Sequence, residues 1–216
     1  PESEDCAMGL VCCKPECGQA NGQHVYIDGM SASGGKIVGK PLLYDVVIEK
    51  PRGSSLGLEL DCAGPATPRV IKIHPGGLIE EYNGRVKEGE AVKRDDFLVE
   101  VNGVRGDAQL MLHRISSASE LRLRFRRPLM LEVPLRKANE TFGMEISHQH
   151  SSNSLVILKL HEGAPAELWS KMNLDLEVLP GDFIVQVNGC EGKAEDLLGM
   201  LQLSEHARLL LCRPDL

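Results

Sequence analysis

The sequence of 216 residues is long enough for one large domain or two small ones, and 42% of its residues are hydrophobic. Only 4% are aromatic, which argues against stacking surfaces for nucleic acid bases. The formal net charge of −7 argues against a general polyanion binder, because such proteins cluster Lys and Arg against phosphates. No stretch approaches the roughly 18 consecutive apolar residues that span a bilayer. These features predict a soluble, cytoplasmic chain that binds no nucleic acid and has no integral membrane segment.

The first 41 residues read as a leader, and the absence of a sustained apolar period predicts that it is flexible. Four of the seven cysteines lie within it: Cys6, Cys12, Cys13 and Cys17. Their spacing lacks the paired C-x2-C pattern of a structural zinc site. Incidental or lipidated cysteines are therefore favoured over a metal or disulfide cluster. The other cysteines lie in segments that read as regular structure, and we expect them to be reduced: Cys62, Cys190 and Cys212.

An internal repeat organises the rest of the chain. Residues 96–103, with the sequence DFLVEVNG, match residues 182–189, with the sequence DFIVQVNG, at an offset of 86. The same offset relates further anchors: Gly57 to Gly143, Glu59 to Glu145, and Arg127-Pro128 to Arg213-Pro214. The chain therefore divides into the leader at 1–41, a first copy at 42–128 and a second copy at 129–216. Because no flexible linker separates the copies, we expect a fixed or semi-fixed mutual orientation.

The sequence pattern of each copy predicts mostly short strands. In chain order, the first copy predicts strands at 46–48, 58–60 and 70–73, a helix at 78–82, a strand ending at Asn102-Gly103, a helix at 107–116 and a strand at 121–125. The second copy repeats this order with strands at 131–135, 144–146 and 156–160, a helix at 166–172, a strand ending at Asn188-Gly189, a helix at 194–201 and a strand at 209–211. Both Asn-Gly dipeptides predict tight turns. The pattern indicates a mainly β protein with α (α+β), in which each copy is a small, partly open β-barrel of about five strands and two helices.

This order of elements, together with two related loops, resembles the PDZ family over residues 42–216, twice. In that family a loop of the form x-hydrophobic-Gly-hydrophobic precedes the second strand, and its N–H groups receive the carboxylate of a partner's C-terminus. The matching residues are Leu56, Gly57 and Leu58 in the first copy and Phe142, Gly143 and Met144 in the second. Glycine suits this role, because nothing blocks the approach of the backbone. The resemblance implies that a peptide adds as a strand beside 58–60 or 144–146.

The resemblance also implies that the second helix of each copy forms the other wall of a peptide groove. The implied groove residues are Leu60, Ala108, Gln109 and Leu112, with Ile115 deeper, in the first copy, and Ile146, Ala194, Glu195 and Leu198 in the second. The commonest PDZ subclass has a His at the start of this helix that bonds a Ser or Thr of the ligand. Neither copy has one, since His113 falls about one turn too late. We therefore expect a hydrophobic terminal residue or an atypical ligand.

Three polar groups of residues are weaker candidates. His148 and His150 have a spacing seen among metal ligands, but no acidic residue or Cys nearby completes a site, so a polar loop is favoured. Arginines alternate along the closing strand of the first copy, where a solvated face is favoured over a site for acidic lipids or partners: Arg122, Arg124 and Arg126. Acidic residues around the second groove predict ligands with basic residues upstream: Glu145, Glu195 and Asp196.

Catalytic motifs are missing from the sequence, which has no Gly-x-Ser-x-Gly elbow, no Gly-Lys-Ser/Thr phosphate loop and no His-Glu-x-x-His helix. We therefore expect a scaffold or adaptor without enzyme activity, cofactor or metal. Its partners are protein C-termini or internal extended peptides, bound by β-strand addition. Two alternatives stay open: the chain is the regulatory region of a larger enzyme such as a protease, or it is a structural repeat whose copies block each other's grooves.

Overall fold

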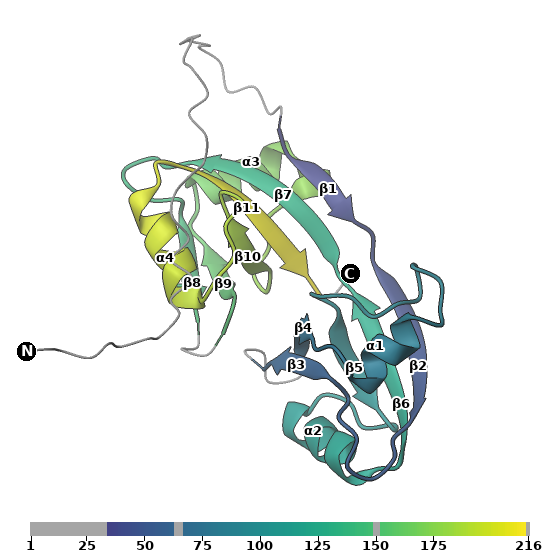
Figure 1. Cartoon of the computed structure of the whole chain (residues 1–216). Helices are drawn as coiled ribbons and strands as arrows, with labels where there is room; N and C mark the ends of the chain where they lie inside the picture. The colour runs from purple at the N-terminus through teal and green to yellow at the C-terminus, as the bar shows by residue number, and fades with distance from the viewer. Residues whose placement is uncertain (1–33, 63–66, 149–151, 215–216) are drawn as a thin grey trace, which may run out of the picture. The chain divides into compact units, whose positions relative to one another are not determined.

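The computed structural model describes residues 34–62, 67–148 and 152–214. The expectations for the four leader cysteines and for His150 concern residues outside these ranges. Within the described part the chain is mostly β, with two antiparallel sheets and a few short helices (Figure 1). None of the helices in this part is long and apolar enough to cross a membrane.

The five-stranded sheet consists of the first copy and has the strand order β2-β6-β5-β4-β3. Its strands are β2 (Leu42–Glu49), β3 (Leu58–Asp61), β4 (Arg69–Ile73), β5 (Phe97–Val101) and β6 (Glu120–Arg127). Two helices connect these strands: α1 (Leu78–Asn83) and α2 (Ala108–Ser117). The alternation predicted for the opening strand is confirmed, because Val46 and Ile48 are buried while Val47 between them is 58% exposed.

The six-stranded sheet contains the second copy and has the order β1-β7-β11-β10-β9-β8. Its second-copy strands are β7 (Leu129–Arg136), β8 (Met144–Ser147), β9 (Leu155–Leu160), β10 (Phe183–Val187) and β11 (His206–Arg213). The helices of this copy are α3 (Pro165–Met172), the short 3-10 helix η1 (Leu174–Leu176) and α4 (Ala194–Leu203). In the described residues, each copy thus contributes five strands and two α-helices, as the sequence pattern predicts.

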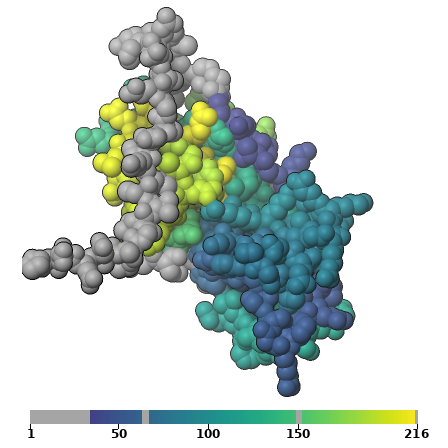
Figure 2. Space-filling model, in the orientation of Figure 1, coloured from purple at the N-terminus to yellow at the C-terminus, as the bar shows by residue number. Residues whose placement is uncertain are grey.

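One strand, β1 (Lys36–Gly39), lies in the segment expected to belong to the flexible leader. It pairs antiparallel with β7 of the second copy, whereas β2, which follows almost at once, pairs with β6 of the first copy (Figure 1). Figure 2 shows this purple-to-blue segment at the molecular surface, where Ile37 is 50% exposed. The pattern of the sequence does not reveal β1, because a four-residue strand after two glycines has no measurable period.

Both Asn-Gly turns form as predicted. Asn102 has φ +48° and Asn188 has φ +54°, and each is followed by a glycine that also has positive φ. The side chain of Asn102 donates to the carbonyl of Glu120 at 2.9 Å and accepts from the N–H of Arg122 at 2.7 Å. Asn188 accepts in the same way from the N–H of Arg208 at 2.8 Å. These bonds close each turn onto the last strand of its copy.

Each copy has its own hydrophobic core, built from the inward side chains of its strands and helices. The core of the first copy includes Val46, Val70, Leu98, Met111 and Phe125. The core of the second copy includes Val133, Ile157, Ile184, Leu197 and Leu209. Because each copy packs its own alternating apolar residues into a separate core, the repeat can be recognised in the sequence.

A third, smaller cluster combines residues of both copies. It contains Phe97 from β5 and three residues of the second copy: Phe183, Val185 and Cys212. The rings of Phe97 and Phe183 lie 5.6 Å apart, a distance typical of aromatic pairs. Burial raises the pKa of the Cys212 thiol well above its ordinary value, so it is a protonated, apolar side chain. The three cysteines in the described part are free.

Candidate functional site

A buried glycine loop precedes one strand in each copy. Gly57 has φ +74° and Gly143 has φ +76°, which is the left-handed region that side chains disfavour. A Cβ at Gly57 would lie 2.7 Å from the Cα of Gly77, and a Cβ at Gly143 would collide with the Cβ of Ala164. Both positions therefore require glycine for two reasons. The backbone has positive φ there, and a side chain would collide with the residue that precedes α1 or α3.

The carbonyl groups of these loops are bonded within the protein. Leu56 O accepts from the N–H of Ile79 at 3.1 Å, and Gly57 O accepts from the N–H of His74 at 2.8 Å. The second copy repeats both bonds, with the acceptors at the offset of 86 and the donors one residue further along: Phe142 with Ala166 at 3.0 Å and Gly143 with His161 at 2.8 Å. The two loops are thus held in the same way, and these carbonyl oxygens already accept hydrogen bonds from within the protein.

The N–H of each loop glycine has an acceptor in its own loop. Gly57 donates to Ser55 Oγ at 3.2 Å, and Gly143 donates to Thr141 Oγ1 at 3.0 Å. Both acceptors are neutral hydroxyl groups. A carboxylate that reached this N–H would share or displace the hydroxyl, because a charged acceptor forms the stronger hydrogen bond.

The strands that follow the glycine loops are the end strands of their sheets. Among the described strands, β3 pairs only with β4, and β8 pairs only with β9. Each begins at the residue directly after its loop glycine. The outer edge of an end strand presents backbone N–H and C=O groups that can pair with an added strand.

The predicted groove residues differ in their exposure. Ala108 and Ala194, the first residues of α2 and α4, are buried, whereas Gln109 and Glu195 beside them are exposed. The others are partly buried: Leu58, Leu60, Leu112, Ile115, Met144, Ile146 and Leu198. The alanines at the two helix starts have no side-chain polar group that could bond a ligand hydroxyl. Contact of these residues with a peptide stays a prediction.

The arginine stripe on β6 is balanced by partners within the protein. Arg124 lies 2.6 Å from Asp45 and 3.3 Å from Glu100, and its hydrogen bond lowers the pKa of the Asp45 carboxyl. The other two arginines bond to a carboxylate and a carbonyl, each at 3.3 Å: Arg122 to Glu120 and Arg126 to Pro214. This arrangement favours the solvated strand face over a site for acidic partners.

The acidic residues near the two edge strands differ between the copies. In the first copy Glu59 Oε2 lies 3.2 Å from Nε2 of His74, the residue that follows β4. In the second copy Glu145, at the matched position of β8, is exposed, and so are Glu195 and Asp196 on α4. The two copies therefore differ at the helix, because the first turn of α4 has two acidic residues and the first turn of α2 has none.

Metal-ligating side chains do not gather in the described ranges, where no three or more His, Cys, Asp or Glu residues form a group suited to an ion. His148 is partly buried and has an interaction within the protein. Its expected neighbour in the two-histidine pattern lies outside the described residues.

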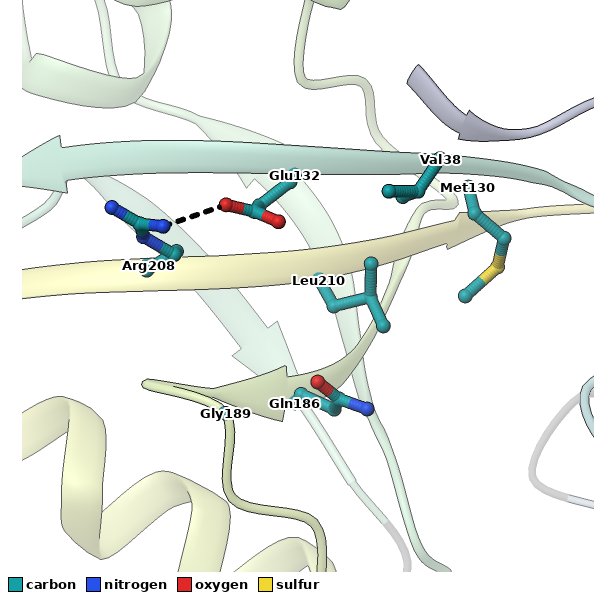
Figure 3. Close-up of a pocket in the computed structure, with 7 residues that line it drawn as sticks. All are labelled: Val38, Met130, Glu132, Gln186, Gly189, Arg208 and Leu210. Atoms are coloured by element: carbon teal, nitrogen blue, oxygen red, sulfur yellow. Dashed lines mark hydrogen bonds and ion pairs between the residues drawn. The ribbon is translucent and has the colours of Figure 1, made fainter. Parts of the chain in front are cut away.

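A hollow of about 410 Å³ lies on the six-stranded sheet (Figure 3). Its apolar lining comes from Val38, Met130 and Leu210, and its polar lining includes Glu132 and Arg208, which are 3.0 Å apart. No pattern in the sequence indicates this hollow, because it depends on β1 lying beside β7. It shares no residue with the predicted grooves.

No family model and no curated protein matches the sequence. Among solved structures, one of INAD PDZ45 in complex with NG2 peptide matches 82% of this chain and 91% of its own, with 17% identity and a TM-score of 0.31. A complex of INAD PDZ45 and NORPA CC-PBM matches 82% of this chain and 93% of its own, with 16% identity and a TM-score of 0.32. These PDZ structures are what the chain is similar to; the strand order and the glycine loops carry the argument that follows.

Proposed function

We propose that the chain is a tandem PDZ-like scaffold or adaptor region that binds extended peptides, above all protein C-termini. Each copy is a partly open barrel, and the peptide adds to it as a strand beside β3 or β8. One observation carries the proposal: in both copies an end strand begins directly after a buried glycine with positive φ. A chance resemblance in one loop would not recur with the same hydrogen bonds in the other.

The glycine loop suits a terminal carboxylate for a chemical reason. Its carbonyl groups are bonded inward, so an incoming anion would meet backbone N–H donors, and the glycine N–H is held by a neutral hydroxyl that a carboxylate can replace. A carboxylate accepts several such bonds at once through its two oxygens, and charge strengthens each of them. An amidated terminus loses the charge and gains donors that the loop cannot accept.

The ligand preference follows from the residues around each edge. Ala108 and Ala194 at the helix starts provide no partner for a ligand Ser or Thr, which supports a hydrophobic terminal residue. On β8 and in the first turn of α4, the exposed Glu145, Glu195 and Asp196 favour ligands with Lys or Arg upstream. The two grooves therefore prefer different peptides.

The contacts between the copies bear on whether the grooves are open. The shared cluster draws on β5, β10 and β11 and includes no described residue of β3 or β8; at β3, the terminal residue Asp61 contacts the other copy. This supports peptide binding over a purely structural repeat. A regulatory role within a larger enzyme would use the same grooves, so it is compatible with the proposal.

A screen of peptides against the whole chain tests this function. We expect members of a random C-terminal peptide library to bind saturably, with Kd on the order of micromolar, because a short peptide loses conformational freedom on binding. Amidation of the terminal carboxylate should weaken each binder by about tenfold or more. Leu112→Arg and Leu198→Arg should each remove one set of binders. Binding that is indifferent to amidation, or no binder at all, would contradict the proposal.

A further inference from the structure

A buried carboxylate at the end of β3 contacts the second copy. Asp61 is 8% exposed and accepts from Arg69 Nη2 at 3.1 Å. It also accepts from Ser152 Oγ at 2.9 Å and from Ser154 Oγ at 3.3 Å. Both serines are buried and lie just before β9 in the second copy. The last residue of the first copy's edge strand thus holds a segment of the other copy in place.

The backbone of the same serine holds the start of α4. Ser152 O accepts from the N–H of Ala194, the first residue of that helix, at 2.9 Å. The first N–H groups of a helix have no partner within it, so an acceptor from elsewhere in the chain satisfies them. Lys193 at the N-cap forms no side-chain capping bond. Ser152 therefore takes the place of a cap.

The matched helix of the first copy begins differently. Asp107 occupies the N-cap of α2, and its side chain accepts from the N–H of Leu110 at 3.0 Å. In the repeat, Asp107 corresponds to Lys193, one offset of 86 later. The helix α2 is therefore capped by the side chain of its own N-cap residue. The start of α4 instead bonds to Ser152, which is held by Asp61 of the first copy.

We propose that Asp61 and Ser152 are positioning residues for the second peptide groove, so that the first copy sets where α4 begins. The link has two bonds, from the Asp61 carboxylate to the Ser152 hydroxyl and from the Ser152 carbonyl to the Ala194 N–H. Burial keeps water from replacing either bond, and the charge on Asp61 strengthens the first. The consequence for peptides rests on the proposed function, whereas the effect on α4 does not.

Amide hydrogen exchange of the whole chain, resolved to single residues by NMR, tests the link without any ligand. Ser152→Ala should raise exchange at Ala194 and in the first turn of α4 by roughly two- to tenfold, within the range that loss of a helix cap produces. Exchange in the first turn of α2 is the internal reference and should not change. Ser154→Ala is the matched control: it also removes a buried hydroxyl that contacts Asp61 and Ser152 Oγ, but among the described residues Ser154 has no hydrogen bond to α4.

Rescue separates positioning from a general loss of stability. Lys193→Asp installs the self-capping residue that the first copy has at Asp107, so it should restore slow exchange in α4 when added to Ser152→Ala. Asp61→Ala should raise the same α4 amides, and its effect should not add to that of Ser152→Ala, because both act through one link. Equal changes in Ser152→Ala and Ser154→Ala, additive effects, or failed rescue would each overturn the proposal.

A peptide selected on the second groove extends the test to recognition. Its affinity should fall by about three- to tenfold in Ser152→Ala and return in the Lys193→Asp double variant, within the range of a helix cap. A peptide selected on the first groove should bind both variants with the same affinity as it binds the natural protein. If no peptide binds either groove, the proposed function fails while the exchange result still decides the role of Ser152. If peptides bind but α4 exchange is unchanged, the positioning role fails alone.

Discussion

Arg127 binds the buried carboxylate of Asp96, with Nε 3.0 Å from Oδ1, and thereby joins the last strand of the first copy to the start of β5. The second copy repeats the pair, since Arg213 Nε lies 2.7 Å from Asp182 Oδ1. This contact explains two of the repeat's anchors, which lie 31 residues apart in each copy. The same pairing of Asp and Arg thus recurs in both copies.

Removal of Asp182 should destabilise the second copy strongly. Asp182→Ala leaves the guanidinium of Arg213, which is only 11% exposed, without its carboxylate partner, and we expect a loss of about 3 kcal/mol in the free energy of unfolding. Arg208→Ala is the control, because Arg208 is 64% exposed and its pair with Glu132 should be worth under about 1 kcal/mol. Urea unfolding measures both. Similar losses in the two variants would contradict this prediction.

Stability should fall at high pH through Tyr44. Burial and the 2.6 Å hydrogen bond from its hydroxyl to Asp96 raise the pKa of Tyr44 far above its ordinary value of 10.0. The folded chain therefore holds this proton more tightly than the unfolded chain does. Its contribution is complete below pH 10 and is lost progressively above it, at no more than about 1.4 kcal/mol per pH unit and less with solvent screening.

A comparison of the natural chain with the Tyr44→Phe variant measures how much the ionisation of Tyr44 lowers stability at high pH. Urea midpoints between pH 8 and pH 11 should fall more steeply for the natural chain above pH 10, because only that chain can ionise residue 44. Parallel curves for the two proteins would show that Tyr44 is not the group responsible.

Crowding at Gly143 can be separated from backbone strain. Gly143→Ala should destabilise the chain by about 2 kcal/mol or more, because the new Cβ meets Ala164 and the residue has φ +76°. Gly163→Ala tests strain alone, since Gly163 has φ +72° but open space around it, and about 1 kcal/mol is expected. Thermal unfolding should place Gly143→Ala clearly below Gly163→Ala. Equal midpoints would remove the close approach as a cause.

Charge reversal on α4 should alter ligand choice in the second groove. Glu195→Lys should weaken peptides with upstream Lys or Arg by about fivefold at low salt, with a smaller effect at high salt. Gln109→Lys makes the matched change in the first copy and should leave these peptides unaffected. Unchanged binding after Glu195→Lys, measured by titration calorimetry, would remove support for the acidic preference.

Features with a local cause could be read from the sequence. The opening strands were visible because buried and exposed residues alternate in them, as Val46 and Val47 do. The Asn-Gly turns were visible because few residues accept positive φ, and Asn102 and Asn188 have it. The loop glycines Gly57 and Gly143 belong here too, although the packing that also requires glycine was not visible.

Contacts between distant residues could not be read in this way. The hydrogen bond of Asp61 with Ser152 joins residues 91 positions apart, and neither residue type is unusual in its local sequence. The strand β1 is short and unpatterned, so only its pairing with β7 makes it a strand. The balance of the Arg124 charge by Asp45 likewise depends on the register of two strands far apart in the chain.

Residue type and spacing within short windows are enough to predict the repeat, its order of strands and helices, and the two glycine loops. Only the folded chain shows that β3 and β8 are end strands, and that α4 begins against a serine held by the other copy. The physical reason is that an edge and a tertiary cap are defined by which partners are near in space. Local periodicity has no information about such partners.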